Sequence, residues 1–84
     1  MSNKNTIIGE TKEYILNEFL AGEDPNALTD QVELITSGIL DSLATLKLVT
    51  FLENTYNVSI EPHEADEENL NTLADIANLV AGKL

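Results

Sequence analysis

The stretch Gly38-Ile39-Leu40-Asp41-Ser42-Leu43 marks the start of a helix and leads directly into the apolar run Ala44-Thr45-Leu46-Lys47-Leu48-Val49-Thr50-Phe51-Leu52-Glu53. Asp and Ser are favoured at helix N-termini because their side-chain oxygens accept hydrogen bonds from the free N–H groups of the first turn. A hydroxyl there lies at the positive end of the helix dipole, where an attached phosphate would also be stabilised. Ser42 is therefore either a helix cap or a residue that carries a modification.

The composition describes a small acidic domain. The 84 residues are enough for a single domain, residues 1–84, with a thin core. Fifteen acidic residues against four lysines and no arginine give a net charge of −11. Nucleic acid and anionic membrane surfaces bind clusters of Lys and Arg, so neither is an expected partner. Such an acidic surface either keeps a small protein soluble or directs it onto basic patches of partner proteins, and composition alone favours the first.

Two further features of the composition concern compartment and covalent chemistry. The chain has no cysteine, so a disulfide framework, a thiolate metal site and a cysteine nucleophile are all excluded. The first residues contain no apolar signal region, and no apolar run approaches membrane-spanning length. We therefore expect a cytoplasmic protein, and a monomer.

Apolar residues recur at helical spacing in four segments. We expect helices at about residues 5–20, 42–56, 63–69 and 73–81, the third of them short, packed as an all-α four-helix bundle. The first helix should end in a left-handed cap at Gly22. Its core side chains are expected to be Ile8, Ile15 and Phe19, and those of the second helix Leu46, Val49, Leu52 and Tyr56. Leu43 and Phe51 are less easily buried in so small a domain.

A long connection, residues 23–39, precedes the second helix. Asp24-Pro25-Asn26 is a turn signal. Apolar residues recur along the connection without strong periodicity, so we expect it to lie across the helices and cover part of the core. A loop of this length is unusual in a small domain, and such loops are often functional. This one leads directly to Ser42.

The sequence offers no self-contained active site. The only histidine is His63, and the chain has no Gly-x-Ser-x-Gly elbow, Gly-rich phosphate loop or His-Glu-x-x-His helix. Five of the eight residues from Glu61 to Glu68 are acidic, but the ligand spacing and glycine of an EF-hand are missing. We therefore expect that the protein is not an enzyme and that it has no metal site. A calcium-binding acidic bundle is a weaker alternative.

At Gly38-Ile39-Leu40-Asp41-Ser42-Leu43 the chain resembles acyl carrier proteins and peptidyl carrier domains, whose attachment motif is Asp-Ser-Leu. The resemblance runs from the first predicted helix to Val80, and length, acidity and helix pattern agree with it. The matching segments beyond the motif are Leu48-Val49, Leu52-Glu53, Tyr56-Asn57-Val58-Ser59-Ile60 and Asn69-Leu70-x-Thr72-Leu73-x-x-Ile76.

The resemblance implies a covalent cofactor and a set of partners. A phosphopantetheinyl transferase, using coenzyme A and Mg²⁺, would attach 4′-phosphopantetheine to Ser42, with Asp41 helping to place the serine and the metal of the transferase. The thiol of the arm would then hold an acyl or aminoacyl group as a thioester. Tethering would keep this group at high effective concentration near a loading ligase and the downstream synthase or modifying enzymes.

The departures from the family pattern are informative too. Carriers of primary fatty acid synthesis typically line the second helix with acids, whereas Ala44 and Lys47 stand at two such positions here. This favours a free-standing carrier of polyketide, nonribosomal peptide or related biosynthesis; a fatty acid carrier, or an unmodified interaction module with the same fold, is the alternative. The expected docking residues are Leu43, Leu46 and Lys47 beside the arm, with Glu64 and Glu67 as rim charges.

Overall fold

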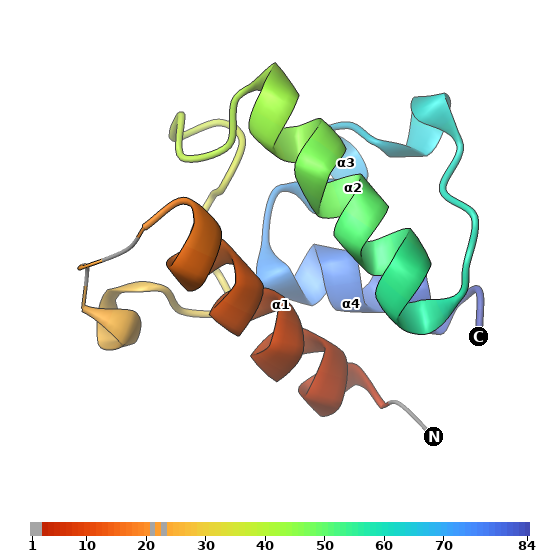
Figure 1. Cartoon of the computed structure of the whole chain (residues 1–84), viewed down its shortest axis with the longest axis horizontal. Coiled ribbons are helices and arrows are strands. Elements are labelled where there is room, and N and C mark those ends of the chain that lie inside the picture. The colour runs from red at the N-terminus through yellow and green to blue at the C-terminus, as the bar shows by residue number, and fades with distance from the viewer. Residues whose placement is uncertain (1–2, 21, 23) are drawn as a thin grey trace.

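Four α-helices and two short 3₁₀ turns form in the part of the chain that the computed structural model describes, residues 3–20, 22 and 24–84 (Figure 1). In chain order the elements are α1 (Lys4–Glu18), η1 (Pro25–Ala27), α2 (Ser42–Tyr56), η2 (Pro62–Glu64), α3 (Glu67–Leu70) and α4 (Leu73–Ala81). The predicted all-α bundle is confirmed, and the second and fourth helices have the predicted bounds. The predicted long connection between α1 and α2 is present as well, and it contains the 3₁₀ turn η1.

A polar side chain caps the start of each of these α-helices. Asn3, Asp41, Asp66 and Thr72 all have extended backbone and accept hydrogen bonds from N–H groups of the turn that follows. Such a cap is worth about 1 kcal/mol, because the first N–H groups of a helix have no partner within it. At the other end of α2, Asn57 adopts the left-handed conformation that commonly ends a helix (φ 55°).

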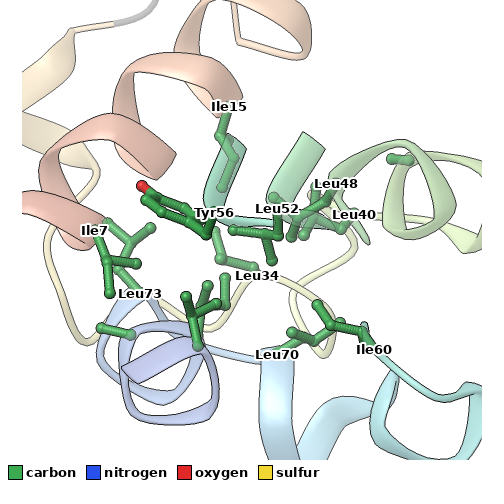
Figure 2. Close-up of a cluster of buried hydrophobic side chains, with 14 of the residues drawn as sticks. Ile7, Ile15, Leu34, Leu40, Leu48, Leu52, Tyr56, Ile60, Leu70 and Leu73 are labelled. Atoms are coloured by element: carbon green, nitrogen blue, oxygen red, sulfur yellow. The ribbon is translucent and has the colours of Figure 1, made fainter. Parts of the chain in front are cut away.

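The core lies where α1, α2 and α4 meet, and the long loop closes it. α1 packs against α4, and α2 contributes a row of side chains at intervals of four residues. Figure 2 shows side chains of these helices converging with loop residues on one cluster. The fully or almost fully buried members are Ile7, Ile15, Leu28, Leu34, Leu40, Leu48, Leu52, Leu70, Leu73, Ile76, Ala77 and Val80. The expectation that the loop covers part of the core is therefore confirmed.

The first helix differs from its prediction in length and in the face it buries. It ends at Glu18, because the N–H groups of Phe19 and Leu20 both donate to the carbonyl of Ile15 and turn the chain early. Gly22 has a positive φ of 92°, yet Phe19 is the C-cap, so the predicted cap is wrong. The buried stripe is Ile7, Thr11 and Ile15, while Ile8 and Phe19 are only partly buried.

The predicted helix 63–69 is wrong as one continuous element. The chain forms η2 and then α3, because Asp66 is extended (φ −133°) and its side chain accepts from the N–H groups of Glu68 and Asn69. A residue that caps a new helix cannot also continue the preceding one. The acidic segment therefore bends at Ala65-Asp66, and residues on both sides of the bend line a groove with the start of α2.

The burial of α2 differs from its prediction in the first half of the helix. Leu46 is 62% exposed, whereas Leu48 is fully buried. The buried row is Ala44, Leu48, Leu52 and Tyr56, with Thr45 beside it, so Val49 lies at the edge and is only partly buried. Leu52 and Tyr56 are buried as predicted, and Leu43 is exposed as predicted.

Candidate functional site

Asp41, and not Ser42, caps α2. Its Oδ1 accepts a hydrogen bond from the N–H of Ala44 at 2.8 Å. Its carbonyl accepts from the N–H and the hydroxyl of Thr45, at 2.9 and 2.8 Å. Ser42 is the first residue of the helix and is exposed. Because Asp41 does the capping, the hydroxyl of Ser42 is available for another role.

The start of α2 also favours a negative group near Ser42. The helix runs for 15 residues, and its first N–H groups point out of the helix end next to Ser42. These groups and the helix dipole attract an anion to this end of the helix. A phosphate bonded to the Ser42 oxygen would therefore be stabilised by the helix dipole.

An open groove of about 590 Å³ lies beside Ser42. One wall comes from the loop before α2, the second from the first two turns of α2, and the third from η2 and α3. The lining residues are Ile35, Leu40, Asp41, Ser42, Thr45, Leu46, Pro62, Ala65, Asp66 and Glu67. The groove is thus apolar along much of its length and carries carboxylates at the α3 side.

The outer face of α2 presents apolar side chains to solvent next to Ser42. Leu43 is 63% exposed and Leu46 is 62% exposed. Lys47, the residue after Leu46, is exposed as well. A second open groove of about 420 Å³ adjoins Leu46 and Lys47 on the α1 side. Its floor includes Tyr14, whose ring stacks on Phe51 with centroids 4.1 Å apart.

The structure separates the two acids that the sequence grouped as rim charges. Glu67 lines the groove beside Ser42. Glu64 is not among the lining residues; its Oε1 is 2.8 Å from Nζ of Lys83 and accepts the N–H of Glu61 at 3.0 Å. The hydrogen bond from Lys83, followed by that from Glu61, lowers the pKa of Glu64. Glu64 therefore joins η2 to the end of α4.

Two structural findings concern other classes of site. Within residues 3–20, 22 and 24–84, histidine and acidic side chains form no group of three or more that could hold a metal ion. Over the same described residues, no helix has the length and apolar content to cross a bilayer.

Comparisons with known proteins identify the family. Residues 18–80 match the family described as "Phosphopantetheine attachment site". The chain belongs to that phosphopantetheine attachment family. The D-alanyl carrier protein of Lactococcus lactis subsp. cremoris (strain MG1363) is 35% identical over 74 residues, which cover 86% of this chain and 94% of the relative. The D-alanyl carrier protein of Streptococcus suis (strain 05ZYH33) is 37% identical over 65 residues, 75% of this chain and 81% of the relative.

Membership of the phosphopantetheine attachment family confirms the predicted cofactor class and the general role. Domains of this family carry covalently attached 4′-phosphopantetheine and act as carriers without catalytic activity of their own. An exposed serine at a helix start, beside an open groove, fits such an attached group: the hydroxyl is accessible and the groove leaves room for the arm.

Sequence reasoning missed part of the groove in this family member. Asp66 carried a recognisable signal, since an Asp followed by Glu67-Glu68 is typical of a helix start. Ile35 and Thr45 carried none, because their place in the groove depends on how the loop folds back on α2. Asn71, which binds that loop, also had no sequence signal.

Proposed function

We propose that this chain is a carrier protein that holds a small aminoacyl group, with D-alanyl as the first candidate, on a 4′-phosphopantetheine arm attached to Ser42. The observation that carries the proposal is the exposed hydroxyl of Ser42, which Asp41 frees from capping, in a chain of the phosphopantetheine attachment family. The relatives named D-alanyl carrier proteins support the cargo, because the similarity covers most of both chains.

The attachment is a phosphoryl transfer onto Ser42. The Oγ of Ser42 forms a bond to the phosphorus of coenzyme A that bears the pantetheine, the phosphoanhydride bond breaks, and the adenosine bisphosphate leaves. The proton of the hydroxyl passes to a base of the transferase. In this step the carrier itself presents the nucleophile and stabilises the phosphate through the N-terminus of α2. The carboxylate of Asp41 caps the helix through one oxygen, and we propose that it also faces the transferase and its metal.

When attached, the arm supplies the thiol that this cysteine-free chain lacks, and the thiol holds the cargo as a thioester. The residues around Ser42 favour an aminoacyl group over a neutral one. An aminoacyl thioester carries an ammonium group, and Glu67 and Asp66 bring carboxylates to the same groove as Ser42. The net charge of −11 also attracts a positively charged cargo.

A fatty acid carrier is disfavoured by the surface of α2. Glu53 is the one acid in the sequence of that helix, and its Oε2 accepts the N–H of Ile60 at 2.9 Å. The carboxylate of Glu53 therefore binds the chain that follows α2 instead of facing a basic partner. The outer face of α2, with its exposed leucines and Lys47, suits partners that bind through apolar contacts and not through a row of acidic residues on the carrier.

We propose that the transferase, the loading ligase and the acceptor enzyme dock on the surface around Ser42. Leu43 and Leu46 supply the apolar contact, since burying an exposed leucine contributes about 1.5–3 kcal/mol. Lys47 and Glu67 supply charges on either side. Glu64 lies outside the groove beside Ser42, and Lys83 already balances its charge. Charge reversal at Glu64 should therefore change partner turnover less than charge reversal at Glu67.

The attachment site is tested by mass spectrometry of the intact chain after incubation with coenzyme A and a broad-specificity transferase. We expect the wild type to gain the mass of one phosphopantetheine group and Ser42→Ala to gain none. Ser37→Ala is the matched control, because Ser37 is an exposed serine in the preceding loop, and it should be modified like the wild type. A mass gain on Ser42→Ala, or none on the wild type, would refute attachment at Ser42.

A further inference from the structure

Asn71 connects the start of α4 to the loop that precedes α2. It lies between α3 and α4 and is partly buried. Its Oδ1 accepts the N–H groups of Ile35 and Thr36 at 3.0 and 3.1 Å and lies 3.4 Å from the hydroxyl of Thr36. Its backbone carbonyl accepts the N–H of Leu34. One residue therefore binds three consecutive residues of a loop that is remote in the sequence.

The loop segment from Leu34 to Leu40 is held by its own hydrogen bonds and leads directly to Asp41 and Ser42. The N–H of Leu40 donates to the carbonyl of Leu34 at 2.8 Å, and the N–H of Gly38 donates to that of Ile35 at 3.1 Å. Gly38 has φ 88°, a conformation that suits glycine, and so lets the segment close on itself. Leu34 and Leu40 are both buried in the core. The residue after Leu40 is Asp41, the cap of α2.

We propose that Asn71 is a positioning residue for the modification of Ser42, acting through the Leu34–Leu40 segment. This inference rests on the proposed attachment at Ser42. Asn71 binds Ile35, which lines the groove beside Ser42, and so holds the segment that immediately precedes Asp41. Loss of the amide oxygen leaves two backbone N–H groups of the loop without their acceptor, so the segment samples other arrangements.

A looser loop should affect binding to the transferase more than the chemical step. The transferase binds the arrangement in which Ser42 and the groove wall are in place, and the apparent affinity falls by the fraction of molecules in that arrangement. If Asn71→Ala leaves about one molecule in ten in this arrangement, the KM for the carrier rises about tenfold. The kcat stays close to the wild-type value, because the bound carrier is the same species.

The test compares three variants as substrates of the transferase with coenzyme A, each confirmed as folded by circular dichroism. Asn71→Ala should show the raised KM with little change in kcat. Asn71→Asp keeps an oxygen acceptor of the same shape and should restore a KM close to wild type. Asn78→Ala is the matched control, since Asn78 is an exposed asparagine on α4, and it should also behave like wild type. Asn71→Ser, which leaves a smaller gap, replaces Asn71→Ala if that variant does not fold.

Hydrogen exchange of the unmodified proteins gives an independent measurement. In Asn71→Ala, amides of residues 34–40 should exchange faster than in wild type, while those of α1 and the centre of α4 should not. A wild-type KM for Asn71→Ala, unchanged exchange in the loop, or failure of Asn71→Asp to restore the KM would overturn the positioning role. A wild type that is never modified would instead refute attachment at Ser42, and the exchange data would still report on the loop.

Discussion

The two faces of α2 are both apolar, but only one of them holds the fold together. Leu48 and Leu52 are fully buried in the core, whereas Leu43 and Leu46 on the same helix are 63% and 62% exposed. The inner face is supported by α1, α4 and the loop (Figure 2). The outer face adjoins Ser42 and two open grooves. We therefore expect stability and partner binding to depend on different residues of one helix, so that substitutions separate the two.

The largest effect is expected for Leu48→Ala. Removing a fully buried leucine side chain leaves a cavity and lowers the free energy of unfolding by about 2–5 kcal/mol. This is a large share of the stability of a domain of this size. Urea denaturation followed by circular dichroism measures the loss. A decrease no larger than that of Leu46→Ala would contradict the assignment of the two faces.

A smaller effect is expected for Asp41→Ala, at the point where the two faces begin. Loss of the hydrogen bond that the N–H of Ala44 donates to Asp41 should cost about 1 kcal/mol of unfolding free energy. Asp41→Asn keeps an accepting oxygen and should keep most of this stability. If Asp41→Asn is as stable as wild type but is modified more slowly at Ser42, the charge of Asp41 acts on the transferase. Equal stability of Asp41→Ala and wild type would rule out the capping role.

The inner face also ends in an ionisable group, Tyr56, whose hydroxyl donates to Oε1 of Glu10 at 2.8 Å. Burial, and then Glu10, raises the pKa of Tyr56. The unfolded chain ionises this tyrosine near pH 10. The stability linked to its proton is thus fully present below about pH 10 and is lost as pH rises from there toward the folded-state pKa.

Tyr56→Phe tests this linkage. At neutral pH it should cost about 1 kcal/mol or less, the net contribution of one hydrogen bond. Above about pH 10 the stability of this variant should fall less steeply than that of wild type, as measured by urea denaturation at a series of pH values. Identical pH profiles for the two proteins would show that Tyr56 contributes nothing to the alkaline loss.

The smallest change in stability is expected for Leu46→Ala and Leu43→Ala. Both side chains are mostly exposed, so their removal should change the unfolding free energy by no more than about 0.5 kcal/mol. The same variants should raise the KM of the transferase for the carrier, because they remove apolar contact beside Ser42. Thr50→Ala, an exposed residue one turn beyond Leu46, is the control and should leave that KM nearer to wild type. Wild-type kinetics for both leucine variants would place partner docking elsewhere.

Local signals were enough to predict two of the helices but not which side of α2 is buried. Asp41 and Thr72 mark the starts of α2 and α4, and those helices were predicted with the observed bounds. The leucines at 43, 46, 48 and 52 follow more than one helical stripe, so the sequence did not distinguish Leu46 from Leu48. That choice is made by contacts with α1, α4 and the loop.

The candidate site was likewise only partly predictable from the sequence. The motif around Ser42 was visible in the sequence, because capping residues and the start of an apolar helix are local features. The groove was not visible. Its third wall depends on the bend at Asp66, and its first wall depends on hydrogen bonds that the N–H groups of Ile35 and Thr36 donate to Asn71. Contacts between residues so far apart leave no pattern in a single sequence.

We propose that Ser42 carries an arm loaded with a small aminoacyl group. The most direct test is the intact mass of the protein purified from the cells that make it, before and after treatment with hydroxylamine, which cleaves thioesters. We predict the mass of the chain plus one phosphopantetheine on Ser42, with a further aminoacyl mass that hydroxylamine removes as the alanyl hydroxamate. A chain recovered only in unmodified form, with Ser42 free, would refute the attachment of the arm at Ser42.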